Sequence, residues 1–199
     1  MSVLVTKEAP DFTKPAVLAD GTIGSFSLSD LRGKSVVLFF YPLDFTFVCP
    51  SEIVAHNHRI AQFKERGVEV VGVSIDSQFT HFAWRNTTLE NGGIGQIDFP
   101  LVADVNHSIA ESYGIAHPQA SVALRASFLI DEKGVVRHQV VNDLPLGRNV
   151  DEMLRMVDAL QHHEAHGEVC PAGWNKGDSA MTGSTEGVAA YLAEHGESL

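Results

Sequence analysis

Two continuous apolar runs, separated by an amphipathic segment, dominate the first third of the chain. The runs at 35–41 and 68–75 are rich in β-branched and aromatic residues, as strands buried on both faces are. Between them, residues 51–66 place apolar side chains at helical spacing and stop at Gly67, where a glycine suits the end of a helix. Pro42 ends the first run. Strand, helix and strand at this spacing predict a right-handed parallel crossover unit.

Strand and helix patterns continue to alternate along the next hundred residues. They predict a helix at 78–90, a glycine-rich loop at 91–95, a short strand at 99–102 and a short helix at 107–113. Two strands, at 122–130 and 135–141, flank a hairpin turn at 131–134, and a last helix follows at 149–163. The order of these elements predicts an α/β protein with a mixed central sheet covered by helices.

The composition changes from about residue 165, where glycines recur in a polar stretch. Residues 185–194 are a short helix candidate, and Ser184 is a suitable cap in front of it. The tail is too small for a hydrophobic core of its own. We therefore expect a main domain at 1–164 and a C-terminal arm at 165–199, which packs on its own core or on a neighbouring subunit.

Composition and charge exclude several classes of protein. The 199 residues include 14 Lys and Arg against 25 Asp and Glu, a net charge of −11, which disfavours nucleic-acid binding. The longest apolar stretch, 36–41, is too short to span a bilayer, and the first 20 residues lack the pattern of a secretory signal. We expect a cytoplasmic protein that binds neither nucleic acid nor membrane.

The chain has only two cysteines, Cys49 and Cys170, too few for a disulfide-stapled scaffold. Histidine is more abundant, and the runs at 56–58 and 162–166 raise the question of a zinc site. No further cluster of metal ligands accompanies either run, so a solvated helix surface is the better interpretation. The sequence therefore predicts neither a metal site nor a cofactor site.

Cys49 lies between a predicted buried strand and a predicted helix. Pro50 suits the first turn of a helix, which puts Cys49 at or next to the N-terminus, where unpaired N–H groups favour an anion. A thiol in that position ionises more readily and becomes a nucleophile. A buried structural cysteine is the alternative, but the polar neighbours Thr46, Ser51 and Glu52 argue against it. Thr46 takes the place of the second thiol of a C-x-x-C pair, so exchange through a local dithiol is excluded.

The pattern Pro42-x-x-x-Thr46-x-x-Cys49 resembles the active-site signature of the peroxiredoxins. The string Phe-Thr-Phe-Val-Cys-Pro-Ser-Glu at 45–52 resembles that of the typical 2-Cys subfamily, which includes the bacterial alkyl hydroperoxide reductase C components. This resemblance implies a thioredoxin-like fold and the reduction of hydrogen peroxide and organic hydroperoxides without a metal or prosthetic group. It also implies that Thr46 donates to a peroxide oxygen and that Pro42 shields the site from water.

The same resemblance assigns roles to three charged residues. Arg125, in the segment 124–131, matches an arginine that accompanies the reactive cysteine; a fixed guanidinium there stabilises the thiolate and the charge that develops on the peroxide. Glu52 is expected to orient arginines by ion pairing. Arg148 matches a second arginine of the family, although a simple cap or surface role is equally compatible with its sequence context.

Cys170 stands in a Val-Cys-Pro motif that resembles the resolving-cysteine motif of typical 2-Cys peroxiredoxins. The resemblance implies that Cys49 is oxidised to a sulfenic acid, which condenses with Cys170 of a partner subunit to a disulfide. Thioredoxin or a dedicated disulfide reductase would then reduce that disulfide. A homodimer, assembling into a decamer, is implied as well. The residues themselves leave open whether the disulfide forms within one chain or between two chains. An alternative function is that of a holdase chaperone or a peroxide-relay signalling protein.

Overall fold

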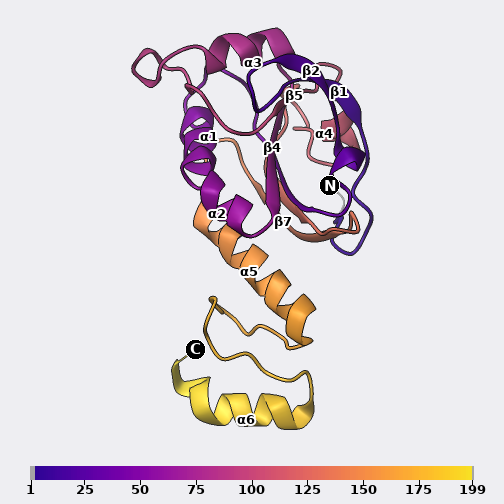
Figure 1. The fold of residues 1–199 in the computed structure, drawn as a ribbon, viewed down its shortest axis with the longest axis vertical. Helices are drawn as coiled ribbons and strands as arrows, with labels where there is room; N and C mark the ends of the chain where they lie inside the picture. The colour runs from indigo at the N-terminus through magenta and orange to yellow at the C-terminus, as the bar shows by residue number, and fades with distance from the viewer. Residues whose placement is uncertain (1–2, 199) are drawn as a thin grey trace. The chain divides into compact units, whose positions relative to one another are not determined.

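A computed structural model describes residues 3–198, and the chain divides between Val150 and Asp151 into two compact units. The first unit contains a seven-stranded mixed sheet with the order β2-β1-β5-β4-β3-β6-β7 (Figure 1). The second contains most of α5, all of α6 and the irregular segment between them. The division places α5 with the C-terminal segment, and the domain boundary after residue 164 stays a prediction.

The elements follow one another in an alternating order. The strands are β1 Thr13–Val17, β2 Ile23–Ser27, β3 Ser35–Phe40, β4 Val68–Ser74, β5 Leu101–Ala103, β6 Arg125–Ile130 and β7 Val136–Asn142. The α-helices are α1 Cys49–His58, α2 Ile60–Glu65, α3 Gln78–Arg85, α4 Ser108–Ser112, α5 Val150–His166 and α6 Thr185–His195. Short 3₁₀ turns are η1 Leu28–Leu31, η2 Leu89–Asn91 and η3 Gly196–Ser198. Within the described chain, no helix is long and apolar enough to cross a membrane.

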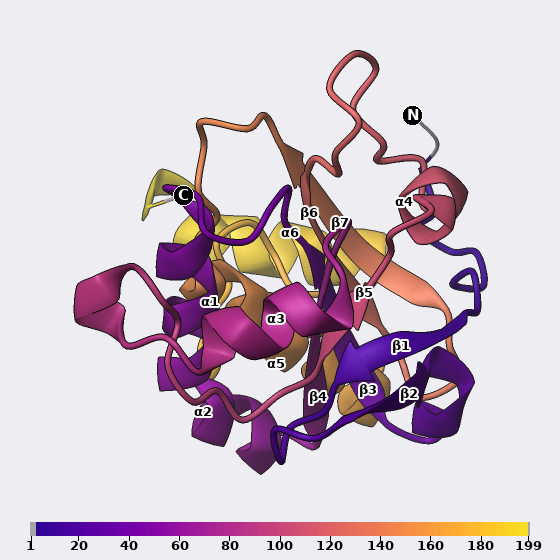
Figure 2. The ribbon, with the colours of Figure 1, turned by 90° about the horizontal axis from the view of Figure 1, so that it is seen from above.

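Strand β3 is an interior strand of the sheet, between β4 and β6, and is buried along its whole length. It pairs in parallel with β4, and α1 and α2 connect the two strands, which confirms the predicted parallel unit. Its side chains alternate between the faces: the Phe39 ring stacks on His56 of α1 with centroids 4.2 Å apart, whereas the Phe40 ring lies 5.2 Å from that of Tyr113, just after α4. Figure 2 shows α1 and α2 on one side of the sheet and α4 on the other.

The predicted single helix at 51–66 is wrong in two respects. The helix begins two residues earlier, at Cys49, and it is interrupted at Arg59. The Arg59 N–H bonds to the carbonyl of His56, three residues back, at 3.1 Å, so the last turn of α1 tightens and the helical ladder ends there. The predicted stop at Gly67 is confirmed, since its φ of 67° lies in the left-handed region that glycine favours.

The predicted helix at 78–90 is also too long, because α3 ends at Arg85. Just beyond that point the Thr87 hydroxyl takes the carbonyl of Ala83 at 2.9 Å, which the Thr87 N–H would need in a continuing helix; that N–H bonds to Trp84 O instead, at 3.1 Å. Such local side-chain bonds compete with helix propagation. Residues 89–91 form the separate turn η2 instead.

The two hairpins of the sheet differ in how well the sequence predicts them. The antiparallel β6–β7 pair is confirmed, and the Asp131 carboxylate closes its turn by accepting from the N–H groups of Lys133 and Val135. The first of these strands begins at Arg125 rather than residue 122. The β1–β2 hairpin was not predicted, because Pro15 and Gly24 interrupt short segments with little apolar alternation.

Candidate active site

Cys49 is the first residue of α1, as predicted, and its side chain has no exposed surface. Pro50 follows it in the first turn, where the missing N–H is not needed. The carbonyl of Val48 accepts bonds from the N–H groups of Ser51 and Glu52, at 3.1 and 3.3 Å, which fixes the start of the helix. The buried thiol therefore lies at the positive, N-terminal end of α1.

The loop between β3 and α1 brings Thr46 onto the sulfur. Phe45, before it, has a φ of 51°, a left-handed conformation that is uncommon outside glycine, and its ring lies 5.7 Å from that of Trp84. The Thr46 hydroxyl is 3.0 Å from Cys49 Sγ and 2.8 Å from the carbonyl oxygen of Leu43. The hydroxyl has a single proton, which can be donated to either acceptor. It can therefore donate to the sulfur when the sulfur is a thiolate, and to the Leu43 carbonyl oxygen when the sulfur carries a proton.

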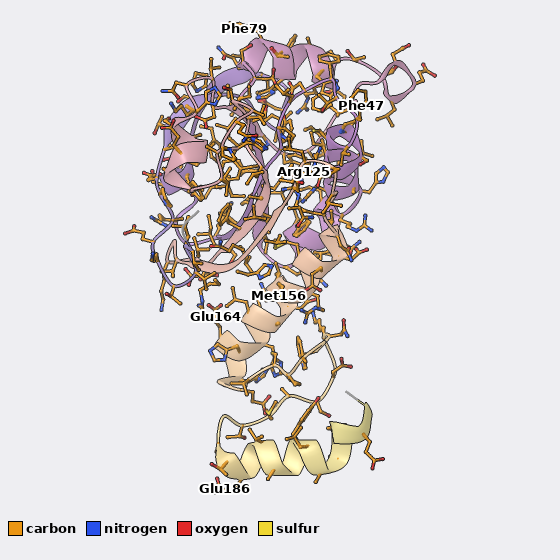
Figure 3. The ribbon with its side chains drawn as sticks, turned by 180° about the vertical axis from the view of Figure 1, so that it is seen from behind. Phe47, Phe79, Arg125, Met156, Glu164 and Glu186 are labelled. Carbon is orange, nitrogen blue, oxygen red and sulfur yellow. The ribbon has the colours of Figure 1, made fainter. Side chains whose placement is uncertain are left out.

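Arg125 approaches the same sulfur from the sheet. It is the first residue of β6, is only 4% exposed, and lies among the side chains of the first unit in Figure 3. Its Nη1 is 3.3 Å from Cys49 Sγ and 2.8 Å from Glu52 Oε2, while its Nε donates to Leu144 O at 2.6 Å. Three partners hold the guanidinium in one orientation. The guanidinium thus places a fixed positive charge next to the sulfur, where it can compensate negative charge on the reacting atoms.

Glu52, one turn along α1, joins two arginines in a buried network. Arg148 donates to its carboxylate through Nε, Nη2 and the backbone N–H, at 2.8 to 2.9 Å, and its Nη1 donates to Ala126 O. Burial alone would raise the pKa of Glu52, but the hydrogen bonds and charge of Arg148, together with Arg125, hold that pKa below its ordinary value. The Arg148 side chain is 3% exposed, which excludes the surface role that its sequence context left open.

A second polar network under the loop was missed at the level of sequence. The Asp44 carboxylate accepts from the Tyr41 hydroxyl at 2.8 Å and lies 2.6 Å from Nδ1 of His81, and the Asp44 N–H donates to Asp76 at 2.7 Å. Burial, with the charge of Asp44, raises the pKa of Tyr41 well above its usual value. Pro42, which lies between Tyr41 and Asp44 in the sequence, is also buried. A tyrosine closing an apolar strand and an aspartate within the loop were the only signals of this network.

His56 makes the fold of this unit sensitive to acid. Burial, followed by the charge of Arg148, lowers its pKa to about 4 from an unfolded value of 6.5. The neutral ring donates to Glu52 O and stacks on Phe39. Because the unfolded chain binds the proton more readily, this contribution is complete above pH 6.5 and is lost as the pH falls toward 4, by at most about 3 kcal/mol.

We therefore expect the His56→Phe variant, which keeps an aromatic ring, to lose much of the pH dependence of unfolding between pH 4 and 6.5. The measurement is the free energy of unfolding in urea at several pH values. His58→Phe is the matched control, because that histidine is exposed, and it should leave the slope unchanged. Equal slopes in the wild type and the His56 variant would contradict the role given to this residue.

Cys170 lies in the second unit, and both cysteines are free thiols. It is half-buried, and its S–H donates to the carbonyl oxygen of Ala159 at 3.5 Å. Burial and the carboxylate of Glu168 raise the pKa of this thiol.

The histidine run at 162–166 does not form a metal site with its neighbours. His162 Nε2 lies 2.8 Å from Glu168, and across residues 3–198 no three His, Cys, Asp or Glu side chains gather as a metal site would need.

A buried thiol at a helix N-terminus, held between a hydroxyl and a fixed guanidinium on a mixed sheet, has the features of a thiol-dependent peroxidase. Comparisons with known proteins agree. An alkyl hydroperoxide reductase C of Helicobacter pylori is 58% identical over 195 residues, covering 97% of this chain and 98% of that protein. That of Buchnera aphidicola from Acyrthosiphon pisum is 57% identical over 195 residues, covering 97% and 99%. The crystal structure of reduced Plasmodium vivax 2-Cys peroxiredoxin, 51% identical, superposes with a TM-score of 0.94 over 96% of this chain and 100% of that chain.

Family models match both parts of the chain. The AhpC/TSA family model covers residues 5–139, and the model for the C-terminal domain of 1-Cys peroxiredoxin covers residues 159–194. The chain belongs to the AhpC/TSA family of peroxiredoxins and has their thioredoxin-like fold. It is a thiol-dependent peroxidase, which confirms the resemblance seen in the sequence.

Proposed function

We propose that Cys49 is the thiol that attacks the peroxide. The observation that carries this proposal is the pair of contacts on its sulfur, 3.0 Å to the Thr46 hydroxyl and 3.3 Å to Arg125 Nη1. The thiolate attacks one peroxide oxygen, the O–O bond breaks, and the leaving oxygen takes up a proton to depart as an alcohol or water. Cys49 is then a sulfenic acid, two electrons more oxidised than the thiol.

The surrounding residues divide the work of stabilising that step. The Thr46 hydroxyl donates to the peroxide oxygen under attack, and Arg125 compensates the negative charge on the sulfur and then on the leaving oxygen. Glu52 keeps Arg125 in position and shares its carboxylate with Arg148, so that the network is charged but balanced. Pro42, buried at the end of β3, keeps water away from the sulfur.

Cys170 of a partner subunit resolves the sulfenic acid to a disulfide, with loss of water. This pairing is supported by the likeness to a 2-Cys peroxiredoxin over nearly the whole chain. A thioredoxin or a dedicated disulfide reductase in the cytoplasm returns the disulfide to two thiols. One similar structure, from Plasmodium yoelii, is described as a thioredoxin peroxidase.

Assembly of homodimers into a decamer is supported by unusually exposed aromatic side chains near the active-site loop. Phe47 is 95% exposed, and Phe45, Phe79 and Phe82 are 50%, 67% and 43% exposed. Figure 3 shows Phe47 and Phe79 at the periphery of the first unit. Several exposed aromatic rings on one unit are typical of a surface that another subunit covers.

Mixing two single-cysteine variants tests the intersubunit disulfide. Cys49→Ser and Cys170→Ser subunits are combined under conditions that allow subunit exchange, treated with one equivalent of hydrogen peroxide, and analysed on non-reducing gels and by mass spectrometry of the Cys49–Cys170 peptide. We expect a covalent dimer from the mixture and none joined by this bond from either variant alone. The wild type should give two such bonds per dimer.

An intrachain bond predicts a different result. The mixture would then contain no Cys49–Cys170 peptide, while the wild type would form it and still migrate as a monomer. Peroxide consumption by the wild type without this peptide would exclude Cys170 as the resolving residue altogether.

A further inference from the structure

Cys170 is part of a structured turn within the second unit. Val169, just before it, forms an antiparallel bridge with Met181 through two hydrogen bonds of 2.9 and 3.1 Å. After it, the Trp174 N–H bonds to the carbonyl of Pro171 at 3.2 Å, and the Trp174 indole is 3% exposed. The backbone around the thiol is therefore fixed on both sides rather than free in a loop.

Arg155 of α5 ties that turn to the helix. Its Nη1 donates to the carbonyl oxygen of Trp174 at 2.8 Å, while its Nε and Nη2 hold both carboxylate oxygens of Glu152 at 2.7 Å each. Figure 3 labels Met156, the next residue on this helix. Because the Glu152 carboxylate already fixes the orientation of the guanidinium, the Arg155 side chain loses little further conformational entropy when it also binds the Trp174 carbonyl. Arg155 is therefore held in the orientation that this contact needs.

The thiol itself faces the same side of α5. Cys170 donates to the carbonyl of Ala159, four residues and thus about one helical turn beyond Arg155. Two charged groups act on it: the carboxylate of Glu168, which with burial raises the pKa of the thiol, and the guanidinium of Arg155, which opposes that increase. Only the thiolate attacks a sulfenic acid at a useful rate.

We propose that Arg155 is a positioning residue for the resolving half of the catalytic cycle: it anchors the turn that presents Cys170 and supplies the positive charge that the Cys170 thiolate needs. This inference rests on the proposed role of Cys170 as the resolving thiol. In the step concerned, Cys170 sulfur attacks Cys49 sulfur, the S–S bond forms, and the sulfenic oxygen leaves as water with the proton that Cys170 gives up. Arg155 takes no part in the oxidation of Cys49.

The first measurement isolates Cys170 from the peroxidase reaction. In the Cys49→Ser background, alkylation of the remaining thiol by iodoacetamide is followed against pH for Arg155, Arg155→Met and Arg155→Lys proteins. We expect the midpoint pH of alkylation to rise in Arg155→Met. In Arg155→Lys it should return most of the way to the wild-type value, because lysine keeps the positive charge but not the several N–H donors of the guanidinium. Lys176→Met, which removes an exposed positive charge from the same segment, is the matched control and should leave the midpoint unchanged.

The second measurement follows the full cycle in proteins with both cysteines. After rapid mixing with hydrogen peroxide, we expect Arg155→Met to form the disulfide roughly threefold to tenfold more slowly than wild type. Sulfinic acid on Cys49, detected by mass spectrometry, should rise in proportion because the sulfenic acid lives longer. Circular dichroism shows whether the variant is folded, and Arg155→Lys provides a second, milder variant.

The outcomes separate the two proposals. If wild-type protein consumes peroxide without forming the Cys49–Cys170 peptide, Cys170 does not resolve and the proposed function fails. If wild-type protein forms that peptide, but Arg155→Met leaves both the alkylation midpoint and the rate of disulfide formation at wild-type values, the inference about Arg155 is overturned. If Arg155→Met and Arg155→Lys both form the disulfide more slowly but keep the wild-type midpoint pH of alkylation, Arg155 does not supply charge to the Cys170 thiolate, and that part of the inference is overturned.

Discussion

The Cys49→Ser variant is expected to consume hydrogen peroxide at about a thousandth of the wild-type rate or less, with reduced thioredoxin or a dithiol as donor. A serine hydroxyl stays protonated at neutral pH, and its oxygen cannot form the sulfenic acid through which the peroxide is reduced. The contacts with Thr46 and Arg125 favour an anion at this position, and serine cannot supply one. Cys170, the other thiol, has a raised pKa and should react with peroxide only slowly, so the loss should be near complete.

Cys170→Ser is the matched control for that experiment, because it makes the same substitution at the other thiol. Supplied with dithiothreitol, which can itself reduce a sulfenic acid, it should keep the rapid first oxidation of Cys49. Peroxide turnover by the Cys49 variant at more than a few per cent of the wild-type rate would refute the assignment of the nucleophile.

Replacing Arg125 with methionine should lower the second-order rate constant for Cys49 oxidation by roughly a hundredfold to a thousandfold. That is the usual cost of removing one preorganised charge from a buried transition state. The guanidinium is 4% exposed and 3.3 Å from the sulfur, so water does not screen it. The rate is measured by stopped-flow tryptophan fluorescence over a range of peroxide concentrations.

An expectation about folding and one control variant make this prediction specific. Glu52 retains Arg148 as a partner when Arg125 is removed, so the carboxylate is not left as a lone buried charge and the variant should fold. Arg32→Met removes an arginine whose ion pair with Glu8 is exposed, and it should change the rate by less than twofold. A decrease of less than threefold in the Arg125 variant would show that its charge does not act on the reacting atoms.

The sequence predicts the parts of this fold that depend on long, uniform patterns. The run at 35–41 was recognised as a strand buried on both faces because each of its residues is apolar or small, and Phe39 and Phe40 do face opposite layers. The start of the catalytic helix was near correct because Pro50 marks a first turn. In the arm, the Ser184 cap is confirmed by its bond from the Gly187 N–H at 3.0 Å.

What the sequence does not predict depends on contacts between distant residues. The break at Arg59 comes from a local shift in hydrogen bonding that no residue type announces. The Asp44–His81 pair joins residues 37 positions apart, and only the folded sheet brings them within 2.6 Å. Similarly, the sequence leaves a cap or surface role for Arg148 open beside the match to the family's second arginine, because nothing near it in the chain reveals the Glu52 carboxylate 96 residues away.

The complete burial of the Cys49 sulfur gives the enzyme selectivity among oxidants and thiol reagents. A sulfur without accessible surface reacts only during a local opening of the structure, and small openings are more frequent than large ones. Hydrogen peroxide, close to water in size, can use the smallest of them, whereas glutathione disulfide or a bulky maleimide must wait for a wider and rarer one. Burial thus protects the Cys49 sulfur from large thiol reagents, while the half-buried Cys170 stays open to larger sulfur compounds.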